Sequence, residues 1–384
     1  MTMSTIATTA DGTLHSPRST VDKDAPFLLS RPETSVRTSG VAAEFSAAQD
    51  AIDALRSGRA GAIVGALPFA ENAPCALTVP VEFTRIRGDL RHDGAAPLPA
   101  ARIVDTTPNP AEHAERVRRA ITALQAGTLD KVVLARSLTV GLQSPLSPTD
   151  LARRLIQLDH SHNGFHVDLS AAGGRFRGRA LVGSTPEVLI ERKGDVVTCH
   201  PLAGSLARHP NPTIDAANAR DLEASAKDRA EHAFVVDSIM SILGPLCRSI
   251  SAPHGPELLR TPQLWHLGTK IEGVLADPDL TALELAVALH PTPAVCGTPT
   301  ATARKHIAQT EDDRGFYAGA VGWCDRSGDG EWMVAIRCAE VAPDGLSARA
   351  FAGGGIVATS DPDAEVNETT TKFKTVLAAF GLTG

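Results

Sequence analysis

The chain has 384 residues, enough for two or three domains, and its 43% hydrophobic and 21% charged content is that of a globular protein with an ample core. A net charge of -7 argues against nucleic acid or an anionic membrane surface as a partner. Residues 1–24 contain no apolar signal-peptide core, no apolar run approaches the length of a transmembrane helix, and the six cysteines form no CxxC pair. We therefore expect a cytoplasmic protein with reduced thiols and no membrane partner.

The N-terminal third carries few signals of chemistry. Residues 1–24 are rich in Ser, Thr and Asp, which predicts a disordered tail. An amphipathic helix is expected over 43–58, and the Pro-rich stretch 71–100 is expected to be irregular. Asn109 followed by Pro110 predicts the start of a helix, because Asn is a good N-cap and Pro fits the first helical position.

Two predicted strands carry candidate acid–base residues. Lys131 opens the strand 131–140 and faces the same way as Val133. It is either an exposed strand-end amine or a partly buried one whose lowered pKa would suit a general base. Glu187 follows a strand break at 184–186 and precedes three aliphatic residues. It is either an edge-strand carboxylate in water or a buried carboxyl whose raised pKa would suit a general acid.

Two acidic pairs have the same helical spacing. Asp228 and Glu231 lie on a long helix predicted over 214–247, and Glu365 and Glu368 lie on the C-terminal helix. A spacing of three places each pair on one stripe beside an apolar line. An acidic first turn or a structural salt bridge would explain one such pair. Two inward pairs on separate helices predict a shared divalent cation, and oxygen-only ligands favour Mg²⁺.

Two further features near the C-terminus indicate an anion. Gly353, Gly354 and Gly355 precede the second acidic pair, and glycines there would expose backbone N–H groups to a bound anion. Arg337 lies in the central strand of an antiparallel meander predicted over 315–357. A guanidinium in such an apolar strand needs a carboxylate partner from the protein or from a ligand.

The chemical signals are spread along the whole chain. A strand that ends in a Gly-containing turn at 203–205 is expected over 196–208, and another strand over 263–275. No P-loop, GxGxxG, HExxH or GxSxG motif is present. One large α+β domain over 25–384 explains this spread better than separable modules do. We expect antiparallel sheets packed with helices around a deep active-site cleft.

From about residue 129 to the end, the chain contains DKVVLAR (130–136), GSTPEVLI (183–190), PLAGS (201–205), ASAKDRAEH (224–232), LWHLGT (264–269), LHPTPAVCGTP (289–299), RGFYAGAVGWCD (314–325), GEWMVAIRCAE (330–340), FAGGGIV (351–357) and ETTTKF (368–373). With this set the chain resembles the chorismate-utilising enzymes, the family of anthranilate, aminodeoxychorismate, salicylate and isochorismate synthases. Within that family it is most similar to the siderophore-pathway isochorismate synthases.

The resemblance implies roles for residues already singled out. Lys131 would activate water for attack at C2 of chorismate, and Glu187 would protonate the departing C4 hydroxyl. Glu231 and Glu368 would hold Mg²⁺, supported by Asp228 and Glu365, and the metal would bind the ring carboxylate. Arg337 and Tyr317 would fix the enolpyruvyl carboxylate, with His266 close by. The substrate-binding residues implied by the resemblance are Ala203, Gly204, Ser205, His266, Ala294, Tyr317, Arg337, Gly353, Gly354, Gly355 and Lys372.

A few positions separate the members of the family. Ala203 stands where aminodeoxychorismate synthases have a nucleophilic lysine, and the presence of Lys131 favours water over ammonia as the nucleophile. Ala294 stands where salicylate synthases tend to have Thr, and Val295 where related isochorismate synthases often have Leu. These positions imply a Mg²⁺-dependent isomerase that feeds 2,3-dihydroxybenzoate or salicylate siderophores. We expect a monomer without a glutamine amidotransferase subunit.

Three alternatives stay open. A salicylate synthase would add a pyruvate-eliminating step, and a menaquinone-pathway isochorismate synthase would differ only in the fate of its product. A chorismate-binding protein without activity would show damage at Lys131, Glu187 or the acidic pairs, and none is damaged.

Overall fold

The structure is a computed structural model that describes residues 25–90, 97–252 and 255–382. The predicted tail, 1–24, lies outside the described residues. The strands are β1 (Phe27–Ser30), β2 (Thr34–Phe45), β3 (Ala62–Leu67), β4 (Ala76–Arg87), β5 (Ala101–Thr107), β6 (Lys131–Leu142), β7 (Gly164–Asp168), β8 (Ala180–Gly183), β9 (Val188–Lys193), β10 (Val196–His200), β11 (Leu202–Ala207), β12 (Cys247–Ser251), β13 (Glu257–Arg260), β14 (Leu264–Gly268), β15 (Ile271–Leu275), β16 (Gly297–Thr298), β17 (Ala320–Asp325), β18 (Gly330–Val334), β19 (Cys338–Val341) and β20 (Ser347–Ile356). The helices are α1 (Ala48–Arg56), α2 (Pro110–Gln125), α3 (Pro148–Leu158), α4 (Pro212–Ala224), α5 (Ala226–Leu243), α6 (Ala282–Leu289), α7 (Thr300–Thr310) and α8 (Pro362–Ala379).

The strands form one 17-stranded sheet and one three-stranded sheet. The large sheet can be followed from β5 through β6, β20, β19, β8, β7, β1, β2, β4, β3, β17, β18, β9, β10 and β15 to β12, with β16 added to the edge of β6. The small sheet has the order β11–β14–β13. All of these pairings are antiparallel, so the predicted α+β class with antiparallel sheets is confirmed.

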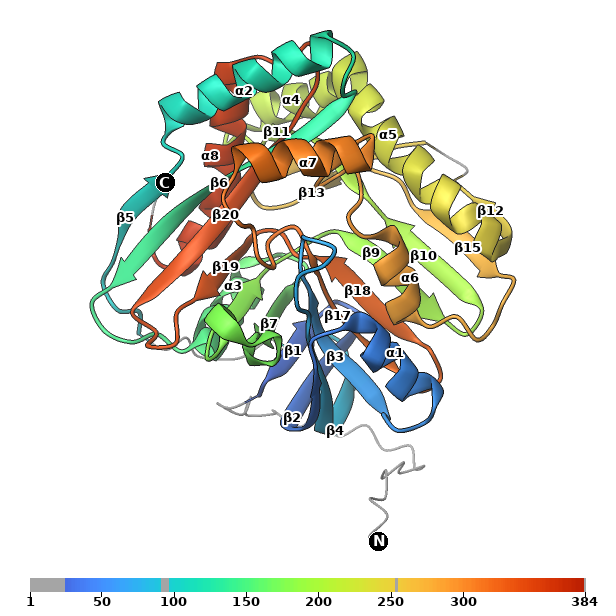
Figure 1. The fold of residues 1–384 in the computed structure, drawn as a ribbon. Coiled ribbons are helices and arrows are strands. Elements are labelled where there is room, and N and C mark those ends of the chain that lie inside the picture. The colour runs from blue at the N-terminus through green and yellow to red at the C-terminus, as the bar shows by residue number, and fades with distance from the viewer. Residues whose placement is uncertain (1–24, 91–96, 253–254, 383–384) are drawn as a thin grey trace, which may run out of the picture.

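The large sheet bends into two halves that flank the centre of the molecule. Figure 1 shows β5, β6, β20 and β19 on one side, β9, β10, β15 and β12 on the other, and β1–β4 at the lower end. Helices α2, α4, α5 and α8 lie together at the upper end. A hydrophobic cluster packs α3 and α8 against β6, β19 and β20, and this packing fixes α8 beside the strands that carry the candidate site.

Local sequence signals set the starts of two helices, and the start at Asn109 is as predicted. The Asn109 side chain accepts a hydrogen bond from the N–H of Glu112, and Pro110 is the first residue of α2. The Asp361 side chain caps α8 in the same way by accepting from Ala364 N–H at 2.8 Å. Among the described residues, no helix combines the length and the apolar character needed to cross a membrane.

Several longer predicted elements are divided. The helix expected over 214–247 is two helices, because Ser225 ends α4 and caps α5 by accepting from Asp228 N–H at 3.2 Å. The strand expected over 196–208 is β10 and β11, and the one over 263–275 is β14 and β15. In both cases the two pieces join different sheets.

Two other predictions are wrong. The stretch 71–100 is not wholly irregular, because β4 runs for 12 residues and pairs with β2. The C-terminal strands are not a simple meander, since β18 pairs with β17 and β9 whereas β19 pairs with β20 and β8.

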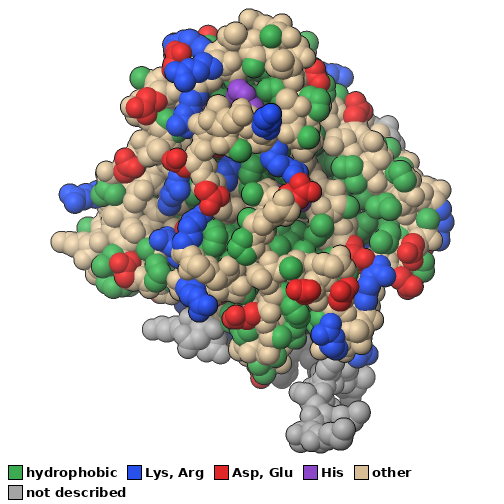
Figure 2. All heavy atoms as spheres, in the orientation of Figure 1, with side chains coloured by type: hydrophobic (Ala, Val, Ile, Leu, Met, Phe, Trp, Pro, Cys, Tyr) green, Lys and Arg blue, Asp and Glu red, His purple; other side chains and the backbone are tan. Residues whose placement is uncertain are grey.

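The described surface carries both signs of charge. Figure 2 shows Lys and Arg side chains interspersed with Asp and Glu over this face, with hydrophobic side chains between them. On α2, for example, Arg118 and Arg119 both pair with Glu115. Such exposed pairs contribute little to stability, so the fold depends on its core and its sheets.

Candidate active site

A pocket of about 640 Å³, counted out to its open mouth, lies where β6 and β20 meet the small sheet and helices α5 and α8. It corresponds to the predicted cleft. The predicted site residues that line it are Glu187, Ala203, Gly204, Ser205, Glu231, His266, Ala294, Tyr317, Arg337, Gly353, Gly355, Glu368 and Lys372. The other predicted site residues, Lys131, Asp228, Gly354 and Glu365, lie directly behind this lining. Residues far apart in the sequence are thus brought to one place.

Lys131 is the first residue of β6 and is fully buried. The alternative of an exposed strand-end amine is therefore wrong. Its Nζ lies 2.9 Å from Glu231 Oε1, in an ion pair between β6 and α5. Gly355 on β20 leaves space for this pair, because a Cβ atom there would lie 2.1 Å from Glu231 Oε1 and 3.0 Å from Lys131 Cε.

Glu187 lies in the break between β8 and β9, at the position that the sequence indicated. Its carboxyl is buried, and burial raises its pKa to about 7 against the opposing effects of a backbone hydrogen bond at Leu202 and the charges of Lys131 and Arg337. The raised pKa predicted for this residue is thus confirmed. A carboxyl with this pKa can both hold and release a proton at neutral pH.

Three of the four predicted metal-ligand carboxylates form ion pairs with lysines. These pairs are Glu231 with Lys131 at 2.9 Å, Glu365 with Lys227 at 2.9 Å, and Glu368 with Lys372 at 2.5 Å. The fourth, Asp228, accepts a hydrogen bond from the Ser225 hydroxyl. Three of the four carboxylates are therefore each paired with one lysine, and Asp228 is not.

The pKa values of these carboxyls reflect burial and their neighbours. Burial, with repulsion from Glu368, raises the pKa of Glu365 to about 7, and burial also raises the pKa of Asp228. Burial opposes ionisation of Glu368 as well, but the charge and hydrogen bond of Lys372, together with Lys227 and the Ser205 hydroxyl, lower the pKa of that carboxyl. Asp228 and Glu365 thus resist ionisation, and they lie near the ionised Glu368. An added positive charge at this place would be favourable, because it would stabilise the ionised form of all three carboxyls.

Among the described residues, no group of three His, Cys, Asp or Glu side chains is arranged closely enough to hold a metal ion. The donor chemistry nevertheless fits a hard cation, since the four groups are all carboxylates on two neighbouring helices. Glu365 Oε2 is buried without a hydrogen-bond partner, and ionisation of such a carboxyl is costly unless a cation meets it. The residues present therefore fit Mg²⁺, provided that the lysine pairs give way.

Arg337 was predicted to lie inside a strand, and this is wrong. It lies in the break between β18 and β19. Its φ of 51° is in the left-handed region, where non-glycine residues are rare and often functional. The residue is buried, its burial lowers the pKa of the guanidinium, and it has no carboxylate partner among the described residues. A buried arginine that lines a pocket without a partner is suited to bind a ligand carboxylate.

Aromatic and imidazole groups complete the polar wall. The Tyr317 ring stacks on Phe351 with centroids 4.9 Å apart. His266 is buried, which holds the pKa of its imidazole well below the usual range, and its Nε2 has no partner among the described residues. His266 is therefore a neutral group that can hydrogen-bond to a ligand.

The three glycines belong to β20 and pair with β6. Gly353 and Gly355 line the pocket, whereas a Cβ atom on Gly354 would lie 3.0 Å from Glu365 Oε2. Lys372 donates a hydrogen bond to the carbonyl oxygen of Gly353 at 2.9 Å, so here it is the carbonyl that binds a charged group. Whether the glycine amides bind an anion stays a prediction.

Sequence reasoning missed several lining residues and one charged group. The lining residues that carry no chemical signal are Val133, Pro186, Leu202, Ile336, Phe351 and Ala352. Lys227 was missed as well, although it directly precedes Asp228 and sits one turn from Glu231. Its position in an acid-rich helix start could have indicated a counter-ion.

Comparison with known proteins agrees with this arrangement. A family model for chorismate binding enzymes matches residues 83–381. A protein of Mycobacterium tuberculosis is 48% identical to this chain, over 94% of this chain and 98% of its own length. It is named, provisionally, the isochorismate synthase MenF. The isochorismate synthase DhbC of Bacillus subtilis is 43% identical over 83% of this chain and 81% of its own.

A solved structure extends the comparison to three dimensions. It is the Bacillus anthracis protein DhbC, described provisionally as a 2,3-dihydroxybenzoate-specific isochorismate synthase. It superimposes with a TM-score of 0.87 at 34% identity and covers 94% of this chain and 97% of its own.

Proposed function

This chain belongs to the chorismate-binding enzymes, and from that premise we propose that it is an isochorismate synthase, an isomerase that converts chorismate to isochorismate. The observation that carries the proposal is the presence, at one pocket, of a carboxyl of raised pKa in the lining and a buried amine directly behind it. Both groups are needed to exchange one hydroxyl for another without a redox cofactor.

In the proposed reaction, Lys131 first loses its ammonium proton, and the neutral amine then accepts a proton from water as the water oxygen bonds to C2 of chorismate. Glu187 gives its proton to the C4 hydroxyl as the C4–O bond breaks, so that one water is consumed, one is released and the double bonds shift. The pKa of about 7 supports this role for Glu187, because much of it is protonated at neutral pH.

Substrate binding is assigned to the unpaired groups of the pocket. Chorismate has two carboxylates, and the Arg337 guanidinium, which has no carboxylate partner among the described residues, is proposed to bind the enolpyruvyl one with Tyr317. The neutral His266 would hydrogen-bond nearby.

Mg²⁺ is proposed as the cofactor. Glu231 and Glu368 would hold it, with Asp228 and Glu365 in support, and when bound it would supply a Lewis acid for the ring carboxylate. The support is the carboxylate-only donor set and the orphaned Glu365 Oε2. Titration of the purified protein with Mg²⁺ by calorimetry tests this directly, and an absence of binding with chorismate present would refute it.

We propose a siderophore pathway as the destination of the product. The name of the Bacillus anthracis relative, with its 2,3-dihydroxybenzoate specificity, supports this. The name MenF supports the alternative, because the menaquinone-specific enzyme of Escherichia coli also carries it. A transcript that rises on iron starvation would favour the siderophore route, and one that follows respiratory growth would favour menaquinone.

Mass spectrometry of the reaction products tests the reaction itself. The protein is incubated with chorismate and Mg²⁺, and the products are separated and weighed. A product of unchanged mass and altered retention is expected for isochorismate. Salicylate with pyruvate would instead identify a salicylate synthase, and no conversion by folded protein would leave a binding protein.

A further inference from the structure

The strand that carries Lys131 is incompletely paired next to the pocket. One edge of β6 pairs with β20 from Val132 to Gly141. On its other edge, β16 pairs with Lys131 and Val132, and β5 pairs only from Ser137 onward. Residues 133–136 lie between these two neighbours, and on that edge the structure as described gives them no strand partner. The N–H of Val133 bonds to the carbonyl oxygen of Cys296 at 2.8 Å, just before β16.

Two charged side chains fill this gap. Arg314 Nη2 donates a hydrogen bond to the carbonyl oxygen of Val133 at 2.7 Å, and Glu311 Oε1 accepts one from the N–H of Ala135 at 2.7 Å. The two side chains also bond to each other in a fork, from Arg314 Nε and Nη2 to the two Glu311 oxygens, both at 2.8 Å. Both are almost fully buried, with 3% and 5% of their side-chain surface exposed. The ion pair therefore takes the place of the missing strand.

The same guanidinium also reaches the 294–295 segment, which adjoins the start of β6 through the hydrogen bond from Val133 N–H to the carbonyl oxygen of Cys296. Its Nη1 donates to the carbonyl oxygen of Val295 at 2.9 Å, and Val295 lines the pocket next to Ala294. The group also lies over the Tyr317 ring at 5.9 Å and the Phe69 ring at 4.4 Å. Four of the five N–H donors of this guanidinium are thus used. Together with the ring contact they connect Val133, Val295 and Tyr317, three residues that line the pocket.

We propose that the Glu311–Arg314 ion pair is a positioning pair for the reaction, which fixes the spacing between the Lys131–Ala135 segment and the 294–295 wall and thereby decides which reaction the bound substrate follows. Neither side chain is a catalytic residue. The inference rests on the proposed function for its readout. Hydroxyl exchange at C2 and C4 acts on bound chorismate, and loss of pyruvate acts on the isochorismate that this exchange forms. The two steps need different placements of the ring and the enolpyruvyl group, so a shift of either segment changes the ratio of their products.

The competing interpretation is that the pair only stabilises the fold. Buried ion pairs often contribute little net stability, and removal of one partner is destabilising because the other is left unpaired. Loss of stability alone would therefore not distinguish the two interpretations. The ratio of products, and the separate effects on kcat and KM, do distinguish them.

The test is Arg314→Lys, with Glu311→Gln as the second variant. Lysine keeps the charge but cannot bond to two carbonyls and a carboxylate in one plane. We expect kcat for isochorismate to fall about tenfold or more, KM for chorismate to change by less than about threefold, and the pyruvate fraction to rise several-fold. Glu311→Gln keeps an oxygen for the N–H of Ala135 and should give a smaller change in the same direction.

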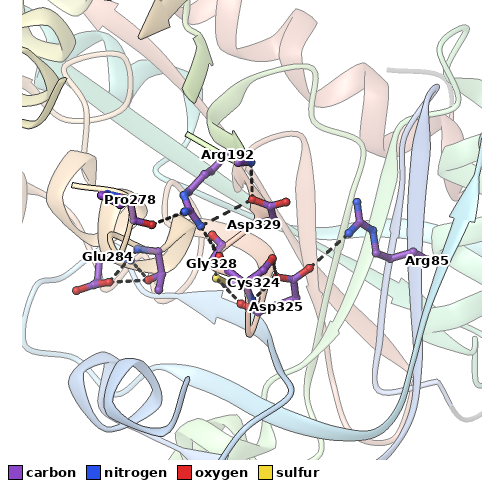
Figure 3. Close-up of polar contacts among 11 residues, drawn as sticks. Arg85, Arg192, Pro278, Glu284, Cys324, Asp325, Gly328 and Asp329 are labelled. Carbon is purple, nitrogen blue, oxygen red and sulfur yellow. Dashed lines mark hydrogen bonds and ion pairs between the residues drawn. The ribbon is translucent and has the colours of Figure 1, made fainter. Parts of the chain in front are cut away.

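The matched control is Arg192→Lys. Arg192 is also a buried arginine that holds two backbone carbonyls, those of Ser327 at 2.8 Å and Pro278 at 2.6 Å. Figure 3 shows it reaching Pro278 and Asp329 in a cluster with Asp325 and Glu284, none of which lines the pocket. Arg192→Lys should lower the melting temperature but leave kcat and the product ratio unchanged.

Hydrogen exchange of the β6 peptide gives a readout that does not need the reaction. The N–H of Ala135 should exchange faster in Arg314→Lys than in the wild type or in Arg192→Lys. If Arg314→Lys behaves as Arg192→Lys in kcat, product ratio and exchange, the proposal is overturned. If the wild type makes no isochorismate, the proposed function fails, and the exchange result still decides whether the pair holds the strand.

Discussion

Gly355→Ala is the sharpest perturbation of the candidate site, because one added methyl group tests the buried ion pair. The new Cβ would lie 2.1 Å from Glu231 Oε1 and 2.8 Å from Glu231 Cδ. The φ of Gly355 is not in the left-handed region, so alanine adds no backbone strain there. Ordinary contact would require the carboxylate to move by about 1 Å or more. Because Lys131 Nζ lies 2.9 Å from the same oxygen, this movement breaks the ion pair.

The magnitude follows from the cost of separating buried charges. Breaking a buried pair costs about 3–5 kcal/mol, and losing half of that from the transition state would slow turnover roughly ten- to seventyfold. The assay is kcat by chromatography of chorismate turnover, with melting temperature measured in parallel. Gly354→Ala is the control, because its Cβ would lie 3.0 Å from Glu365 Oε2 and requires only a small adjustment. Wild-type kcat and melting temperature in Gly355→Ala would refute the reasoning.

Four further outcomes are expected. Lys131→Ala should abolish turnover while circular dichroism shows an intact fold, and full activity would remove the assignment of the base. With Glu187 as the acid, kcat should fall as the pH rises above about 7, and Glu187→Gln should lose both the activity and this limb of the pH profile. Lys227→Gln removes an ammonium that competes for a predicted metal ligand, so calorimetry should show Mg²⁺ binding about tenfold tighter, and weaker binding would contradict this. Burial lowers the pKa of His166 to about 4, below its value in the unfolded chain. The folded protein should therefore lose about 3 kcal/mol of unfolding free energy as the pH falls from 6.5 through 4, and none above pH 6.5. Urea unfolding of His166→Gln should show a smaller loss of unfolding free energy over that range.

The chemical residues could be predicted from the sequence because their constraints are local. Lys131 at a strand start and Glu187 after a proline are visible in short stretches of sequence. For each, the alternative of a buried side chain is the correct one. The acidic pairs were predicted to point inward by helical spacing, and Glu231 and Glu365 are buried. Glu112 and Asp361 show that capping is equally local.

The arrangement of the strands could not be predicted in the same way. The strand expected over 196–208 divides at Pro201, and its two pieces join different sheets, a choice made by partners elsewhere in the chain. The helix break at Ser225 did have a local signal, a serine three residues before Asp228, but the apolar line running through both helices concealed it. Arg314 was overlooked because two of its partners, the carbonyl groups of Val133 and Val295, come from other segments of the chain.

The charges of the pocket give the strongest reason to expect a divalent cation. Lys131 and Lys372 bring two ammonium groups to the pocket, but each is already neutralised by a glutamate, Glu231 or Glu368. Arg337 alone lines the pocket without a carboxylate partner among the described residues. A dicarboxylate substrate brings two negative charges into this buried space, and one guanidinium can match only one of them. The second carboxylate needs an added positive charge, and the acidic pairs on α5 and α8 are the groups that could hold it there.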